Sequence, residues 1–124
     1  MESLEEEVEK ARPATVLALP YLSGSPHDPS ATCALVGLTL ETGPGEIARA
    51  VMEGVCMEVK GVVEAMREAG VRIERMGVAA PSKAPKHWAR ILASTLNLPA
   101  YLTSTGQVEA MGAAIMAMTA LGFH

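Results

Sequence analysis

The sequence predicts a small α/β domain in which helices alternate with a few short strands. Its 124 residues suffice for one domain, and 49% hydrophobic against 19% charged residues indicates a folded core rather than disorder. From residue 46 onward the apolar pattern runs in the order helix, strand, helix, strand, helix. A strand–helix–strand unit with a short crossover places its strands parallel. Because two strands make a poor sheet, we expect the chain to belong to something larger or to pair with another copy.

The N-terminal part divides into an acidic lead-in, residues 1–14, and the start of the domain, residues 15–124. The lead-in is interpreted as a short or frayed helix whose glutamates keep the chain soluble. Residues 15–19 form a short apolar run, expected as a buried strand or an extended segment. Residues 23–31 contain Gly24 and two prolines, which predicts a loop, and the next apolar run follows it.

A long helix is predicted from about residue 46 to residue 69. Apolar residues recur there at three- and four-residue steps and define one face, namely Ile47, Val51, Val55, Val59, Val62 and Met66. Gly70 is placed to end the helix. Gly54 and Gly61 lie inside it, and each costs about 1 kcal/mol of helix propensity relative to alanine. We therefore expect both glycines to permit close packing against another element.

The elements after the long helix are shorter. A strand is predicted over residues 71–78, a loop over 79–86 and a helix over 86–96, with Asn97 as its left-handed end. A second strand is predicted over residues 100–103.

A last helix is predicted over residues 107–121, after a turn at 104–106. It is almost wholly apolar, which is typical of a helix buried on more than one side.

Charge and composition exclude several classes of function. The net charge of −4 and a pI near 5.3 argue against nucleic acid as the main partner, which needs a basic face. No apolar run approaches the roughly 20 residues that would cross a bilayer, so no membrane association is expected. Two cysteines are too few for a disulfide scaffold, which favours a reducing, cytoplasmic location.

Metal and nucleophile chemistry find little support in the spacing of the histidines and cysteines. No pair shows the spacing of a zinc site. Cys33 and Cys56 are both expected to be packed thiols.

A small basic cluster surrounds the predicted start of the helix over residues 86–96, and it consists of Lys83, Lys86, His87 and Arg90. It is either a solvated helix start or a contact for a nucleotide phosphate, since helix N-termini favour anions. Trp88 is expected to be core, with stacking on adenine as the alternative.

Several motifs resemble those of the FGGY carbohydrate kinases, and xylulokinase-like members most of all. Leu19-Pro20-Tyr21-Leu22-Ser23-Gly24, followed by Pro26 and by Asp28-Pro29, resembles the family's LPYLSGERTPxxDP segment. Residues 35–38 and 46–53, separated by a seven-residue spacer, resemble its second signature. Residues 88–93, 98–99 and 109–114 resemble its closing elements. The likeness covers residues 17–121.

The resemblance implies an α/β fold that is part of a ribonuclease H-like, actin-type ATPase lobe with few strands. Complete family enzymes phosphorylate a sugar hydroxyl with ATP and Mg²⁺ in the cleft between two lobes. The family's adenosine loop, GGGAKSPLW, aligns with residues 80–88 of this chain. The resemblance therefore implies that Ala80, Pro81, Ser82 and Lys83 border adenosine, with Gly112 behind them.

The adenosine loop departs from the family pattern. Ala80-Pro81-Ser82 replaces three glycines that let the backbone approach a purine or phosphate without a Cβ. Pro81 also lacks an N–H donor. Binding of ATP or ADP is therefore expected to be weak or lost.

Phosphoryl transfer needs carboxylates for Mg²⁺, turns that hold phosphate and a base beside the hydroxyl. The family places these in its first lobe and in the hairpin that opens the second, and no Asp-x-Gly-Thr loop occurs in these 124 residues. We therefore expect no catalytic residue in this chain and no activity by it alone.

Two hypotheses follow from this. In the first, the chain is the nucleotide-side C-terminal fragment of an ATP-dependent kinase for a ketose, such as xylulose, or a polyol. In the second, it is a non-catalytic docking or self-association module derived from such a kinase. Its partner is the missing N-terminal lobe or another copy, and exposed sheet edges favour a homo-oligomer.

Overall fold

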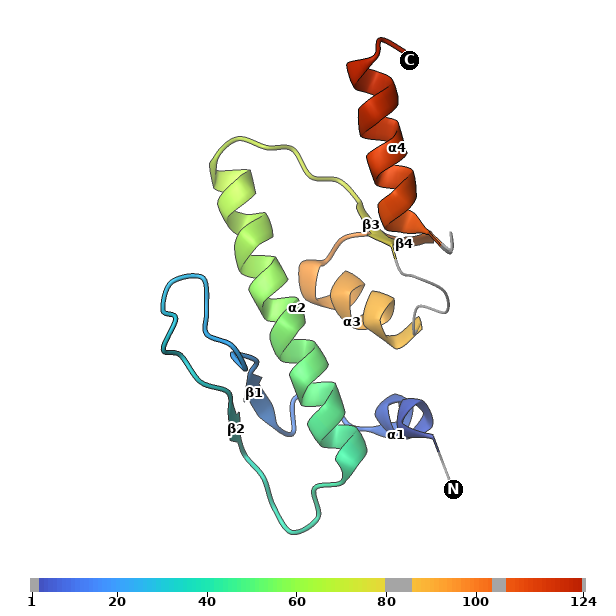
Figure 1. Cartoon of the computed structure of the whole chain (residues 1–124). Coiled ribbons are helices and arrows are strands. Elements are labelled where there is room, and N and C mark those ends of the chain that lie inside the picture. Colours follow the sequence, from blue (N-terminus) through green and yellow to red (C-terminus); the bar gives the residue numbers. More distant parts are fainter. Residues whose placement is uncertain (1–2, 80–85, 104–106, 124) are drawn as a thin grey trace.

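The computed structural model describes residues 3–79, 86–103 and 107–123 (Figure 1). In chain order the elements are α1 (Leu4–Lys10), β1 (Leu17–Leu19), β2 (Ala34–Val36), α2 (Pro44–Glu68), β3 (Met76–Ala79), α3 (Lys86–Leu96), β4 (Ala100–Thr103) and α4 (Val108–Ala120). Helix α2 runs through the middle of the molecule, with α1, β1 and α3 packed against it and β4 packed against α3. The predicted α/β class is confirmed.

Residues Leu4–Lys10 of the acidic lead-in form helix α1, which packs against α2. The Glu6 backbone N–H donates to Ser3 Oγ at 3.3 Å, and the Ser3 N–H donates to Glu6 Oε2 at 3.0 Å, which is a capping box. Val8 is buried. Gly45 at the start of α2 approaches so closely that an added Cβ would lie 2.6 Å from the Glu7 carbonyl oxygen. One glutamate of the lead-in therefore caps a helix.

Helix α2 begins two residues earlier than predicted and ends one residue earlier. Pro44 occupies its first turn, where the missing N–H costs nothing. Glu46 Oε2 accepts from the Gly43 N–H at 2.7 Å, so the acidic side chain holds the helix start. Gly70 follows the end of the helix with φ of +88°, as the sequence predicts for a left-handed stop.

The buried face of α2 differs from the predicted one at its C-terminal end. Val62 and Met66 are 61% and 42% exposed, whereas Ala50, Cys56 and Val63 are buried. The reason is that α1, β1 and α3 pack around the earlier turns of α2, and its last turns extend past them (Figure 1). Apolar spacing identifies faces of a helix but not how far along it a partner reaches.

Strands β1 and β2 form an antiparallel pair in which Leu17 lies opposite Val36. Of the predicted segment 15–19, only Leu17–Leu19 forms a strand, and only alternate residues of the segment point inward. Val16 is 2% exposed, whereas Leu17 and Leu19 are 65% and 51% exposed. The outer face of this pair is apolar and open in the described part of the chain.

Strands β3 and β4 form the predicted parallel pair, joined by a helix. Met76 lies opposite Ala100 and Ala79 opposite Thr103. The strand predicted over residues 71–78 in fact begins at Met76, because β4 offers only four residues with which to pair. Arg72 and Glu74 form an exposed ion pair in the segment before it.

Helix α3 has the predicted bounds, and Asn97 ends it with φ of +50°. Its buried residues Ala89, Ile91 and Leu96 complete the core around α2.

Helix α4 contradicts the prediction of a helix buried on more than one side. None of its residues is buried, and it projects away from the rest of the described structure (Figure 1). The helix is apolar, as the sequence shows, but no described element packs closely against it. Although α4 is apolar, none of the described helices has the length and hydropathy needed to traverse a lipid bilayer.

Candidate functional site

The carboxyl ends of β3 and β4 form the edge at which a ligand is expected. The two strands are parallel and in register to their last residues, Ala79 and Thr103. The segments that follow β3 and β4 therefore leave the sheet at the same edge. Helix α3 begins at Lys86 and α4 at Val108, shortly after these strand ends. In α/β sheets, ligands bind beyond the carboxyl ends of the strands, near helix N-termini.

Most of the predicted nucleotide site lies outside the described residues. This applies to Ala80, Pro81, Ser82 and Lys83. Gly112 is described and lies exposed in the second turn of α4, and a Cβ added to it would meet no described atom within 4 Å. Within the described part of the chain, Gly112 therefore faces open space.

In the basic cluster at the start of α3, Lys83 lies outside the described residues, whereas Lys86, His87 and Arg90 are described. Arg90 Nη1 lies 3.3 Å from Glu9 Oε1, so this side chain reaches toward α1. Trp88 lies half-buried beside a pocket of about 390 Å³ between α1 and α2, together with Val8 and Val51. Trp88 is therefore only partly covered and is not one of the buried core residues, contrary to the expectation.

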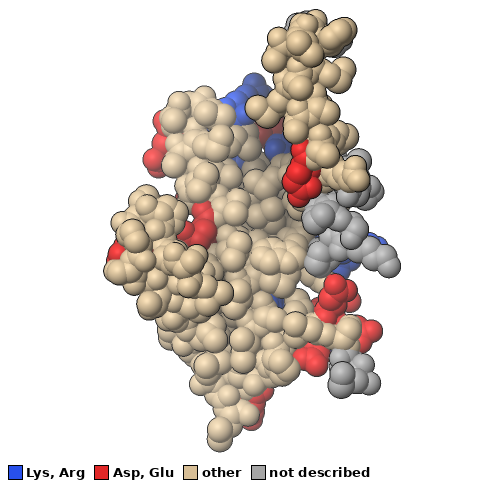
Figure 2. Space-filling view, viewed as in Figure 1, with Lys and Arg blue, Asp and Glu red and all other residues tan. Residues whose placement is uncertain are grey.

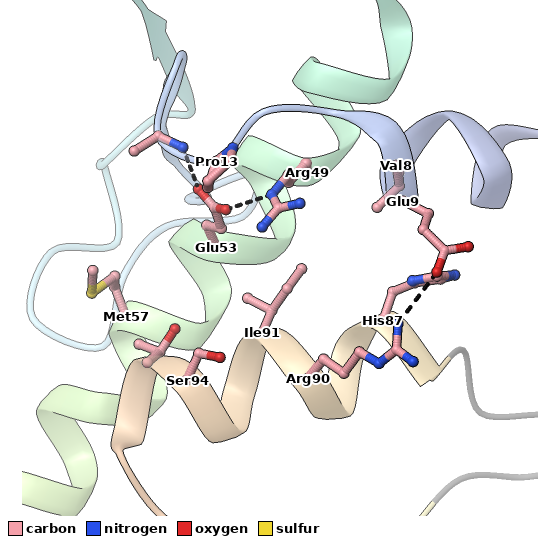
Figure 3. A pocket seen from close by; sticks show the side chains of 12 residues that line it. Val8, Glu9, Pro13, Arg49, Glu53, Met57, His87, Arg90, Ile91 and Ser94 are labelled. Atoms are coloured by element: carbon pink, nitrogen blue, oxygen red, sulfur yellow. Dashed lines mark hydrogen bonds and ion pairs between the residues drawn. The ribbon is translucent and has the colours of Figure 1, made fainter.

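A second pocket, of about 340 Å³, lies where α1, α2 and α3 meet (Figure 3). Arg49 and Glu53 come from α2, whereas His87 and Arg90 come from α3, and Ile91 lies between the two groups. Sequence analysis did not single out this pocket. The available signal was the four-residue spacing of Arg49 and Glu53, which places opposite charges side by side on a helix.

The Arg49–Glu53 pair ties the segment after α1 to α2. Arg49 Nε donates to Glu53 Oε1 at 2.8 Å, and Arg49 Nη1 donates to the Ala11 carbonyl oxygen at 2.9 Å. The Ala14 N–H donates to Glu53 Oε2 at 3.2 Å. Both side chains are less than a quarter exposed. The hydrogen bonds of Arg49 and Glu53 are made to each other and to backbone groups of residues 11 and 14, which indicates a structural role.

No metal centre is formed by the described residues. In the ranges 3–79, 86–103 and 107–123, no three His, Cys, Asp or Glu side chains come close enough to hold an ion.

Comparison with known proteins identifies the family. The sequence matches the C-terminal domain of the FGGY family of carbohydrate kinases over residues 1–121. The chain belongs to this family. It is 34% identical over 116 residues to the xylulose kinase of Escherichia coli (strain K12), a match that covers 90% of this chain and 24% of that protein. The chain thus spans about a quarter of the length of the curated relatives it matches.

Solved structures show the same fold. The xylulose kinase of Rhodospirillum rubrum aligns with a TM-score of 0.75 and 23% identity, over 89% of this chain and 24% of that one. The glycerol kinase of Plasmodium falciparum, solved with ADP, aligns with a TM-score of 0.78 and 20% identity, over 98% and 25% of the two chains. The ribonuclease H-like, actin-type fold class is confirmed.

In this FGGY domain residues 19–29, which resemble the family's LPYLSGERTPxxDP segment, fold back on themselves and rest against α2. The Tyr21 hydroxyl donates to Glu58 Oε1 at 2.6 Å, and this acceptor raises the pKa of Tyr21. Gly24 has φ of +89°, and a Cβ on it would lie 2.7 Å from the Pro29 carbonyl oxygen. Hydrogen bonds from Ser30 lower the pKa of Asp28. The contacts of this stretch in the described structure are structural.

The two cysteines of the domain differ in environment. Cys56 is 1% exposed as expected, and burial, followed by the nearby Glu53 carboxylate, raises the pKa of its thiol to about 11. Cys33 is exposed, contrary to prediction, because the chain there lies just before a short outer strand.

This difference predicts selective thiol modification. Near neutral pH the raised pKa keeps Cys56 protonated and therefore poorly nucleophilic, and its burial blocks access. In the folded chain we expect Ellman's reagent to modify one thiol rapidly, and both thiols in denaturant. Cys33→Ser should remove the rapid reaction completely. Rapid reaction of two thiols in the folded chain would contradict the assignment.

Proposed function

We propose that this chain is the nucleotide-side part of the C-terminal domain of an ATP-dependent sugar kinase and that it is inactive alone. The observation that carries the proposal is the shared carboxyl edge of β3 and β4, in a chain that matches the FGGY C-terminal domain. The complete enzyme would transfer phosphate from ATP to a hydroxyl of a ketose such as xylulose or of a polyol such as glycerol. Relatives with both names match the chain.

In this proposal adenosine lies against the loop after β3. Ala80, Pro81, Ser82 and Lys83 border it, and Gly112 of α4 lies behind. The described start of α3 would place N–H groups toward an anion at the same edge. The structural likeness to a glycerol kinase solved with ADP supports an adenine nucleotide as the ligand. Because Pro81 offers no N–H and Ala80 carries a Cβ, binding would be weak.

Catalysis would depend on residues that this sequence does not contain. Asp28 is its only aspartate, and its carboxylate is occupied by Ser30 in an exposed loop. The carboxylates that hold Mg²⁺, the phosphate turn and the sugar site would come from the remaining three quarters of a family kinase. We also propose that residues 1–14 are a lead-in docked onto the domain 15–124, and that the protein acts in the cytoplasm.

Titration with ADP, followed by two-dimensional amide NMR, tests the nucleotide site. We expect weak binding, with shifts confined to residues 80–90 and the first turns of α4. Lys83→Ala should weaken binding further. Lys60→Ala is the matched control, because Lys60 forms only an exposed, 3.9 Å pair on α2. No binding at millimolar ADP, or shifts centred on the pocket between α1, α2 and α3, would contradict the site.

A coupled ADP-release assay tests inactivity. With ATP, Mg²⁺ and either xylulose or glycerol, we expect no turnover above the rate without protein. Turnover by the isolated chain that disappears in Lys83→Ala but persists in Lys60→Ala would overturn the proposal.

The alternative, a docking or self-association module, is favoured by one observation. Helix α4 has no buried residue, so its apolar surface is available to a partner. That partner would be the remainder of a kinase or a second copy of this chain.

A further inference from the structure

The pocket of about 340 Å³ where α1, α2 and α3 meet is built by helical periodicity (Figure 3). Its walls are a row of α2 residues and a row of α3 residues, each at four-residue steps, namely Arg49, Glu53 and Met57, and His87, Ile91 and Thr95. Residues of α1 and of the segment after it close a third side. Pockets that hold small molecules have volumes from roughly 300 Å³ upward and combine apolar walls with a few polar groups. We call this cavity the three-helix pocket.

The charged side chains of the three-helix pocket are paired with one another. Arg49 Nε lies 2.8 Å from Glu53 Oε1, and Arg90 Nη1 lies 3.3 Å from Glu9 Oε1. A cation in the pocket would be repelled by both guanidinium groups, and an anion by both carboxylates. Figure 2 shows further acidic atoms over α1, at the lower right, which also oppose an anion. The charge pattern therefore favours a ligand without net charge.

Polar groups of the pocket keep hydrogen-bonding capacity. The Arg49 guanidinium carries five N–H groups, and the described contacts use one on Nε and one on Nη1. Each Glu53 carboxylate oxygen has two lone pairs and accepts one described hydrogen bond. The hydroxyls of Ser94 and Thr95 also line the pocket, and within the described ranges neither forms a hydrogen bond. The pocket therefore offers unused donors, unused acceptors and two groups that can act as either.

The centre of the three-helix pocket is apolar. Ile91 lies between the charged groups of α2 and α3, and Val8 and Pro13 line the side toward α1 (Figure 3). A polyol matches this division, because its hydroxyls donate and accept hydrogen bonds while the C–H groups of its carbon chain can contact apolar side chains.

We propose that the three-helix pocket binds a small neutral polyol. The carbon chain of the polyol lies against Ile91, and its hydroxyls form hydrogen bonds with the Arg49–Glu53 pair on one wall and with Ser94 and Thr95 on the other. The ion pair stays intact and presents a preformed polar wall, which lowers the ordering cost of binding. Among the described residues, none of β3, β4 or α4 lines the pocket, so this inference does not rest on the proposed nucleotide site.

Titration of the full chain with ribitol, followed by two-dimensional amide NMR, tests the pocket. We expect saturable binding in the millimolar range, with shifts centred on residues 49–57 and 87–95. Ribonate and ribitylamine keep the same carbon chain but carry one negative and one positive charge. Each should therefore bind at least about tenfold more weakly than ribitol.

A double variant tests the contacts. Ser94→Ala together with Thr95→Val removes both hydroxyls and should weaken ribitol binding at least about tenfold, because two hydrogen bonds are lost. Thr119→Val is the matched control, because it makes the same chemical change on α4, where the Thr119 hydroxyl donates to the Ile115 carbonyl oxygen at 2.9 Å. It should leave the affinity for ribitol unchanged. The amide spectrum of each variant checks that it is folded.

Three results would overturn the proposal. The first is the absence of saturable shifts throughout the millimolar range of ribitol. The second is binding of ribonate or ribitylamine as tight as that of ribitol, which would identify an ion site instead. The third is an unchanged affinity for ribitol in the folded double variant, which would place the polyol elsewhere on the chain.

Discussion

Gly54→Ala is expected to destabilise the domain, although alanine is the better helix former. An added Cβ at Gly54 would lie 2.5 Å from the Ala18 carbonyl oxygen and 3.4 Å from Pro20 Cδ. The first contact is with backbone of β1, which cannot rotate away as a side chain can. Overpacking of this kind costs about 1 to 3 kcal/mol. Relief requires β1 to move off α2, which disturbs its pairing with β2.

Gly61→Ala is the matched control on the same helix. A Cβ at Gly61 meets no described atom within 4 Å, so alanine there should stabilise the domain by about 1 kcal/mol through helix propensity. Because both variants gain the same propensity, the difference in their free energies of unfolding isolates the packing of Gly54. We expect a difference of about 2 kcal/mol in urea denaturation. Equal stability of the two variants would contradict close approach of β1 to α2.

The two glycines also show what the sequence could predict. Both lie in α2 at an apparent cost in helix propensity, and close packing was predicted for both. It is confirmed for Gly54 and wrong for Gly61 in the described structure. The distinction depends on which turn of α2 the backbone of β1 crosses. That contact joins segments more than 30 residues apart, so local pattern carries no information about it.

Helix α4 shows a different limit of sequence interpretation. Its range was predicted to within a residue or two, because helical propensity and end signals are local. Burial was wrong, because it is a property of what packs against the helix. An apolar helix predicts a partner, but the sequence does not say whether that partner lies in the same chain. For the nucleotide site, prediction rested on family resemblance; of its residues only Gly112 is described, and its role stays a prediction.

Loss of the Arg49–Glu53 pair is the second change from which we expect a large loss of stability. Glu53→Ala removes the acceptors of both Arg49 Nε and the Ala14 N–H, in a region where both side chains are mostly covered. Because the Arg49 Nε donor is part-buried, leaving it without a partner costs about 1 to 3 kcal/mol. Because Arg49 also donates to the Ala11 carbonyl oxygen, loss of its anchor should loosen the segment between α1 and β1. We expect unfolding at lower urea and faster amide exchange at Ala14.

Two variants separate this network from a general effect of removing glutamate. Glu64→Ala breaks another four-residue ion pair on α2, but that pair is exposed and its atoms are 3.9 Å apart, so the change should stay within about 0.5 kcal/mol. Glu53→Gln keeps an oxygen acceptor without the charge and should fall between wild type and Glu53→Ala. If Glu53→Ala proved no more destabilising than Glu64→Ala, the pair would be a surface contact. Arg49 and Glu53 would then be free to bind a ligand in the pocket between α1, α2 and α3.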